Sequence, residues 1–207
     1  MKLSRFMLLI WLPIHLLLSG CCQTVADSAD GLAEIDIVNS LGKYHAIPVS
    51  EFVTELEYIP LETGNDCLIA RVENVIVTST HIFITSRNRC YAFDRVGRFI
   101  RQIGGIGQGP GEYTNLSGIS IDEINRSLYL ETPRNLLEYS WDGGFRRSIQ
   151  KPVQNEFHAE KTVFVRDGVF IGHYPNPYGN DMYHYQLFNE SGQVVKSFDN
   201  PVRFEPA

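Results

Sequence analysis

The sequence predicts an all-β fold, a β-propeller of four-stranded blades with about three to four blades present. One observation is a series of short runs rich in β-branched and aromatic residues, separated by turn residues, with almost no helical periodicity. These runs cover Phe52–Leu61, Val72–Thr78, His81–Thr85, Arg89–Phe93, Phe99–Ile103, Gly118–Ile121, Ser127–Leu130, Leu136–Tyr139, Thr162–Val165 and Tyr183–Phe188. The uniformly apolar run at 81–85 is typical of a buried central strand.

The second observation is a turn that recurs three times along the chain. Each copy has an aromatic residue, polar turn residues, a glycine, a polar residue and an apolar residue, as in Phe93–Phe99, Tyr139–Phe145 and Phe188–Val194. The glycines at 97, 143 and 192 are 46 and 49 residues apart, and each is expected to have positive φ in a tight hairpin. A period of about 40–50 residues is typical of propeller blades. The alternative is an irregular β-sandwich.

The N-terminus has the pattern of an export signal. Lys2 and Arg5 precede an apolar run over residues 6–18, which is shorter than a membrane-spanning helix and contains Pro13. Leu18-Ser19-Gly20-Cys21 resembles the bacterial lipobox, so cleavage before Cys21 and acylation of its thiol are expected, with a plain signal peptide as the alternative. We therefore divide the chain into a signal peptide (1–20), a polar tether (21–34) and the propeller (35–207).

Composition and missing motifs exclude several classes of function. The net charge is −6 and lysines and arginines do not cluster after Arg5, which argues against nucleic acid binding. Without a G-x-S-x-G, H-E-x-x-H or Cys/His metal motif, we predict no catalytic residue, cofactor or metal. Cys67 and Cys90 are either a disulfide, which export would permit, or two small buried apolar side chains.

The strongest candidate ligand site is the segment from residue 173 to residue 184. Tyr174, Tyr178, Asp181 and Tyr183 combine aromatic faces that can stack on sugars with a carboxylate that can accept from hydroxyl groups. The alternative is a long hairpin whose tyrosines pack on the sheet. Asp122–Asn125 is either a calcium loop or, since the spacing of such a loop is lacking, a hairpin turn. His158–Glu160 is interpreted as surface sequence.

A glycine-rich string at 104–113 has no phosphate-loop ending and is expected to connect two blades, with Tyr113 packed between them. With Tyr58–Glu62 and Phe93–Ile100, the string Gly107–Tyr113 resembles the bacterial six-bladed β-propeller lipoproteins related to NHL-repeat propellers. This resemblance implies a propeller anchored by lipid in the bacterial cell envelope and no defined reaction. Six blades would need about 300 residues, whereas 187 of the 207 residues follow Gly20.

Such a partial ring would be either a truncated product or half of a ring that another copy completes. Its open blade edges would favour self-association. The leading hypothesis is a non-catalytic, lipid-anchored module that binds a glycan, peptide or protein outside the cytoplasm. The alternatives are a lyase or hydrolase with a metal in the propeller channel, and a truncated paralogue without activity.

Overall fold

The computed structural model describes residues 36–42, 46–176 and 178–204. The predicted signal peptide, Cys21 and the tether lie outside these residues. The chain divides into two units, and the first, which ends at Leu56, contains a short helix α1 (Ile37–Ser40) and a single 3-10 turn, Val49–Glu51. In the described part of the chain, no helix is long and apolar enough to cross a membrane.

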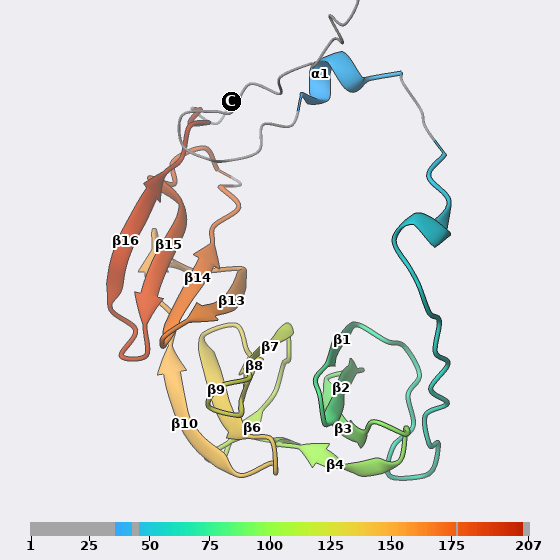
Figure 1. The fold of residues 1–207 in the computed structure, drawn as a ribbon. Helices are drawn as coiled ribbons and strands as arrows, with labels where there is room; N and C mark the ends of the chain where they lie inside the picture. The colour runs from blue at the N-terminus through green and yellow to red at the C-terminus, as the bar shows by residue number, and fades with distance from the viewer. Residues whose placement is uncertain (1–35, 43–45, 177, 205–207) are drawn as a thin grey trace, which may run out of the picture. The chain divides into compact units, whose positions relative to one another are not determined.

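The second unit, Glu57–Ala207, contains three four-stranded antiparallel sheets, so the all-β prediction is confirmed. The first sheet has strands β1 (Asn74–Val77), β2 (His81–Ser86), β3 (Arg89–Asp94) and β4 (Phe99–Ile103). The second has β7 (Gly118–Asp122), β8 (Ser127–Glu131), β9 (Asn135–Ser140) and β10 (Phe145–Gln150). The third has β13 (Lys161–Arg166), β14 (Val169–His173), β15 (Tyr183–Asn189) and β16 (Val194–Asp199). Figure 1 shows the three sheets in chain order, and the described residues form no closed ring.

The repeated turn joins the last two strands of each sheet. Gly97, Gly143 and Gly192 have φ values of +86°, +82° and +75°, which confirms the expected left-handed conformation. Packing also requires glycine at position 97, because a Cβ there would lie 2.0 Å from the Pro60 carbonyl oxygen. The turns therefore set the period of the fold, since each one returns the chain to the outer strand of its sheet.

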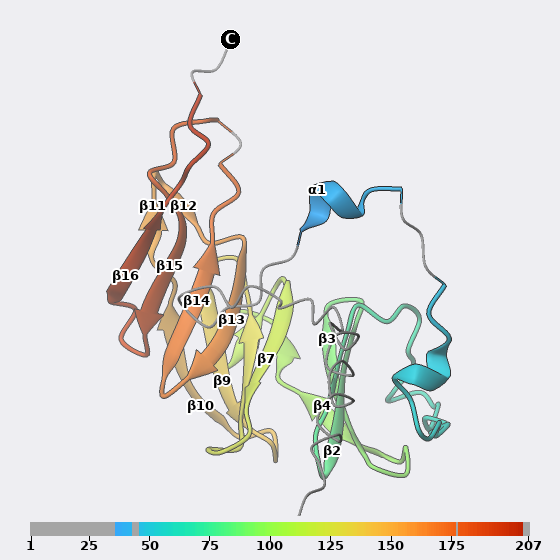
Figure 2. The same cartoon turned by 45° about the horizontal axis from the view of Figure 1, so that its top comes forward.

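Two apolar clusters join neighbouring sheets. Between the first and second sheets, Phe83 and Ala92 pack with Leu130, Leu137 and other residues. Between the second and third sheets, the cluster contains Tyr129, Leu136, Ile149, Phe170 and Phe188. Alternate residues of each strand face opposite ways, so the middle sheet supplies side chains to both clusters. Figure 2 shows the second sheet between the first and the third.

The outer face of the first sheet is covered by the irregular segment 57–70. Its Ile59 and Leu61 pack with Phe93, and Glu62 fixes the segment by accepting from the Phe99 N–H at 2.9 Å. The predicted strand at Phe52–Leu61 is therefore wrong. Phe52 is 73% exposed and Tyr58 84% exposed, so the apolar pattern there does not fill one face of a strand.

The glycine-rich string connects β4 to β7, as predicted, through the short parallel pair β5 (Gly105–Ile106) and β6 (Glu112–Tyr113). Tyr113 is buried in the cluster between the first two sheets, and its hydroxyl donates to the Ile103 carbonyl at 3.2 Å. The Tyr139 hydroxyl donates to the Gly111 carbonyl. Backbone therefore approaches aromatic side chains closely here, and a Cβ on Gly111 would lie 2.7 Å from the Phe145 ring.

Candidate functional site

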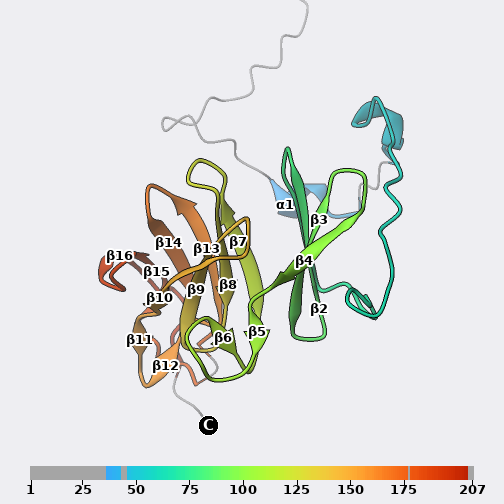
Figure 3. The ribbon, with the colours of Figure 1, turned by 90° about the horizontal axis from the view of Figure 1, so that it is seen from below.

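The connections between sheets gather at one end of the molecule's β unit. The strand register places the start of β7, the β8–β9 turn and the end of β10 together, because Gly118 pairs with Glu131 and Asn135 with Gln150. The β14–β15 loop lies at the same end of the third sheet, where Lys161 pairs with His173. Figure 3 shows β5, β6, β11 (Val153–Gln154) and β12 (Phe157–His158) at this end. We call it the loop end, and loops on a rigid sheet scaffold often carry binding residues.

A cavity of about 470 Å³ lies at the loop end between the second and third sheets. Its walls include Arg134 from the β8–β9 turn, Lys151 and Phe157 from the β10–β13 connection, and Tyr174 and Asp181 from the β14–β15 loop. A second cavity of about 300 Å³ borders the glycine-rich connection, and Arg134 lines both. The Arg134 guanidinium has no ion-pair partner among the described side chains.

A buried ion pair supports the wall of the larger cavity. Lys151 and Glu131 are each 1% exposed, with 3.2 Å between Lys151 Nζ and Glu131 Oε1. Lys151 Nζ also donates to the Ala159 carbonyl at 2.8 Å. Burial raises the pKa of Glu131 and lowers the pKa of Lys151, while the attraction between the two partners opposes both shifts. Of the three donors of the Lys151 ammonium, two are used within the protein, and the pair is buried behind the wall of the cavity.

The structure separates the four predicted ligand residues by their exposure. Tyr174 and Asp181 line the cavity but are 2% and 6% exposed. The Tyr174 hydroxyl donates to the Pro152 carbonyl at 3.2 Å, and burial raises its pKa to about 12. Asp181 Oδ1 accepts from Asn155 Nδ2 at 2.9 Å. These two residues hold the loop against the β10–β13 connection.

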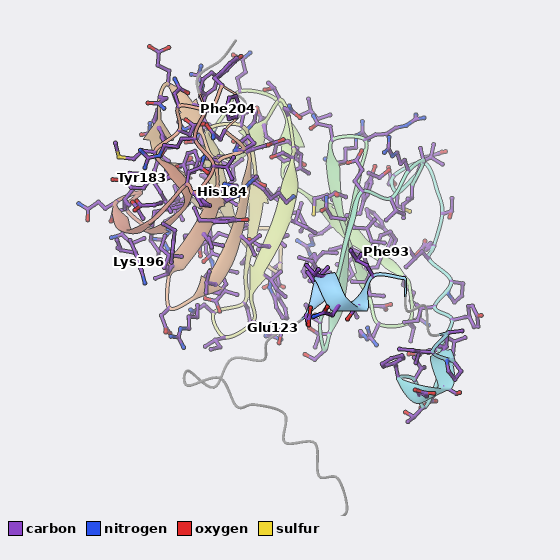
Figure 4. The ribbon with its side chains drawn as sticks, turned by 90° about the horizontal axis from the view of Figure 1, so that it is seen from above. Phe93, Glu123, Tyr183, His184, Lys196 and Phe204 are labelled. Atoms are coloured by element: carbon purple, nitrogen blue, oxygen red, sulfur yellow. The ribbon has the colours of Figure 1, made fainter. Side chains whose placement is uncertain are left out.

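Tyr178 is 56% exposed, and its ring lies 6.1 Å from the ring of Phe157, which is 53% exposed. Tyr183 opens β15, where its backbone N–H and carbonyl bond the Gln154 amide at 3.1 and 3.0 Å (Figure 4). Of the predicted residues, Tyr178 therefore presents an accessible aromatic face, while Tyr183 is bound through its main chain.

Sequence reasoning missed the other half of this site. Arg134, Lys151 and Glu131 carry no motif, and they meet only because the sheet register places strand ends together. The interpretation of 158–160 as surface sequence is partly wrong: Ala159 is 1% exposed, and the His158 ring approaches the Lys151 carbonyl at 3.0 Å. The buried strand-end Glu131 was the available signal, because a carboxylate in an apolar strand needs a partner.

The other sequence candidates have structural roles. Asp122 Oδ1 accepts from the backbone N–H groups of Ile124 and Asn125, which is the arrangement of a hairpin turn. Cys67 and Cys90 are free and buried in different apolar clusters on opposite faces of the first sheet. Within the described residues, no three His, Cys, Asp or Glu side chains are grouped as metal ligands.

Comparisons with solved structures show the same fold in one longer protein. The chain is 22% identical to a Bacteroides fragilis protein described as a "putative exported protein", with a TM-score of 0.61 over 72% of this chain and 43% of that one. A DUF4221 family member from Bacteroides vulgatus is 10% identical, with a TM-score of 0.48 over 70% of this chain and 46% of that one. The chain thus spans less than half the length of either structure.

No curated protein matches the chain. A family model described as "Domain of unknown function (DUF4934)" matches residues 32–204, which include all three sheets and both cavities. Since this match extends over most of the sequence, the chain belongs to the DUF4934 family.

Proposed function

We propose that this chain is an exported, lipid-anchored binding module that takes a glycan at the loop end, in the cavity between the second and third sheets. The anchor is Cys21, the tether is 21–34, and the sheets are blades of a propeller. The binding role requires no reaction at the site.

Two observations support the location. The first twenty residues have the order of a secretory signal followed by a lipobox-like Cys21. The structurally similar Bacteroides fragilis protein is described as exported. Two acyl chains on Cys21 would hold the domain at a membrane stably, because each buried CH₂ contributes about 0.8 kcal/mol.

The exposed Phe157–Tyr178 pair beside the cavity is the observation that carries the proposed ligand class. Two neighbouring rings, each about half exposed, offer faces on which the apolar side of a sugar can stack. The guanidinium of Arg134, which lines the cavity, can donate to sugar hydroxyl or carboxylate oxygens. Apolar walls with a few fixed polar groups are the usual composition of a small-molecule site.

The buried Glu131–Lys151 pair supports this role because it holds the wall of the cavity in place before a ligand binds. Both side chains are fixed by strand ends and by a second bond from Lys151 to the Ala159 carbonyl. A preorganised cavity wall avoids part of the ordering cost of binding. We therefore expect the cavity to change little between the free and bound forms.

The test is a glycan array, paired with a peptide array, probed with the chain from Cys22 onward. We expect glycan binding that Phe157→Ala and Arg134→Ala each weaken about tenfold, as loss of about 1.4 kcal/mol would do. Arg166→Ala is the matched control, because that side chain is 84% exposed and Arg166 ends β13, at the opposite end of the strand from Lys161 and the loop end. Its binding should equal that of the unmodified chain.

Other outcomes would contradict the proposal. If the chain bound peptides alone and Phe157→Ala weakened that binding, the site would be correct but the ligand would be a peptide and not a glycan. If neither Phe157→Ala nor Arg134→Ala changed glycan binding, the binding site would lie outside this cavity. No ligand on either array would argue against a binding module.

A further inference from the structure

The two cavities of the loop end share one wall. Pro133 and Arg134, in the β8–β9 turn, line both the cavity of about 470 Å³ and the cavity of about 300 Å³. The link between β6 and β7 also borders both, since Thr114 lines the smaller cavity and Ser117 lines the larger one. A ligand that lies over the β8–β9 turn can therefore contact both cavities at once.

Hydrogen bonds fix both borders of this path. Asn88 holds the β6–β7 link, because its Nδ2 donates to the Thr114 carbonyl at 2.8 Å and its Oδ1 accepts from the Leu116 N–H. On the other border, the Thr132 N–H donates to the Asn135 carbonyl at 2.9 Å and closes the β8–β9 turn. A fixed path lowers the ordering cost of binding an extended ligand.

The two cavities differ in the groups that they offer to a ligand. Beside the larger cavity, the exposed rings of Phe157 and Tyr178 provide apolar faces. The smaller cavity is lined mostly by polar side chains, among them Gln108, Glu112, Thr114, Thr132 and Asn135. Amide and carboxylate groups of this kind bond to hydroxyl groups. The path thus has an aromatic end and a polar end, with Arg134 between them.

The charges that line the two cavities favour a neutral ligand. Four carboxylates and two cations line them, namely Glu112, Glu156, Glu160 and Asp181 with Arg134 and Lys151. Of the two cations, Lys151 is already paired with Glu131. A ligand with a negative charge on each unit would therefore meet more repulsion than attraction. Neutral hydroxyl groups, in contrast, donate to carboxylates and accept from a guanidinium.

Each cavity is large enough to hold part of a longer ligand. Pockets that bury a small molecule have volumes of about 300–1,000 Å³, and the two cavities, at about 470 and 300 Å³, both reach this range. We propose that the ligand of the loop end is a neutral oligosaccharide longer than a disaccharide, which lies over Arg134 with sugar units in both cavities. This inference rests on the proposed function and adds the length and the charge of the glycan.

Calorimetric titration of the chain from Cys22 onward tests the length and the charge. The probes are neutral gluco-, xylo- and manno-oligosaccharides from disaccharide to hexasaccharide, and galacturonic acid oligomers of the same lengths. In a neutral series that binds, the affinity should rise about tenfold or more between disaccharide and tetrasaccharide, because the longer chain reaches the second cavity. The acidic oligomers should bind more weakly at each length.

Three results would overturn the inference. Equal affinity at all lengths, or tighter binding of the acidic oligomers, contradicts it and leaves the proposed function in place. If none of the neutral probes binds, the inference is also wrong, and the glycan array described above decides separately whether the chain binds a glycan.

Substitutions then test whether the ligand spans both cavities. Gln108 and Asn135 line the smaller cavity and not the larger one. Gln108→Ala and Asn135→Ala should each weaken tetrasaccharide binding about threefold to tenfold, as the loss of one hydrogen bond would do. Disaccharide binding should stay unchanged in both variants, because a disaccharide remains beside Phe157 in the larger cavity. Phe157→Ala should weaken the binding of both lengths.

Gln193→Ala is the matched control, since Gln193 lies in the β15–β16 turn at the opposite end of the third sheet. Circular dichroism checks that each variant is folded. Gln108 is exposed, so its variant tests the path even if Asn135→Ala does not fold. Tetrasaccharide binding that the smaller-cavity variants leave unchanged overturns the placement of the ligand across both cavities.

Discussion

The first and third sheets share one strand order but differ at their outer faces. On the first sheet, Ile82, Ile84, Tyr91 and Phe93 are at most 5% exposed, because segment 57–70 lies over them. On the outer face of the third sheet, which faces away from the second sheet, Val163, Val165, Tyr185 and Phe198 are 44%, 50%, 39% and 39% exposed. The difference shows that sheet formation does not by itself bury a face: an irregular segment without hydrogen-bonded strands does so for one sheet, and nothing in the described chain does so for the other.

The largest expected effect comes from removing a large side chain from the covered face of the first sheet. Phe93 is fully buried beside Phe99, so Phe93→Ala should lower the free energy of unfolding by about 3–5 kcal/mol. Phe198→Ala, on the outer face of the third sheet, should cost only about 1–2 kcal/mol, because its side chain is 39% exposed and less of its apolar area is buried. Urea unfolding at low micromolar concentration measures both. Equal losses would show that the outer face of the third sheet is covered in solution even when the chain is dilute.

An intermediate effect should come from the glycine under the covering segment. Gly97→Ala would place a methyl group 2.0 Å from the Pro60 carbonyl oxygen, and the backbone at φ +86° adds strain. We expect a loss of about 2–3 kcal/mol, of which about 1 is the strain of the left-handed backbone. Gly143→Ala is the matched control: at φ +82° its new methyl would meet side chains and no backbone, the flexible Arg101 at 3.0 Å and Ile103 at 3.4 Å. If Gly143→Ala lowered the stability as much as Gly97→Ala does, the contact between residue 97 and Pro60 of segment 57–70 would not be the cause of the loss.

The smallest effect should be a dependence of stability on pH from two histidines. The His173 ring lies beside the Tyr185 ring on the third sheet, and His81 packs on Phe83 and Trp141. Burial lowers the pKa of both histidines. As the pH decreases, these histidines therefore bind protons in the unfolded chain at a higher pH than in the folded chain. Stability should be constant above the unfolded pKa of about 6.5 and fall as pH decreases through the lower folded values. NMR titration of both rings checks the direction, and His173→Asn should weaken the dependence without removing it. A folded pKa above 6.5 at either ring would reverse the predicted sign.

Sequence reasoning predicted the strands and turns well where a local rule applied. Positive φ at Gly97, Gly143 and Gly192 follows from turn geometry, and the run at 81–85 is buried as its uniform apolar pattern indicates. It failed at Phe52–Leu61, where a run rich in β-branched and aromatic residues predicted a strand. Ile59 and Leu61 instead pack without strand pairing on a sheet that follows them in the chain. The cavity escaped prediction for a related reason, since Arg134, Lys151 and Tyr174 come from three separate connections.

By itself, the sequence determined the all-β class, the spacing of the repeated turn and the link from β4 to β7, because each depends on residues close together in the chain. Only the tertiary structure decided which faces are covered, which strand ends meet around Lys151 and Glu131, and that the Tyr174 ring is buried while that of Tyr178 is exposed. Those outcomes depend on contacts between residues far apart in sequence. A pattern of apolar residues shows that a face can be buried, but not what buries it.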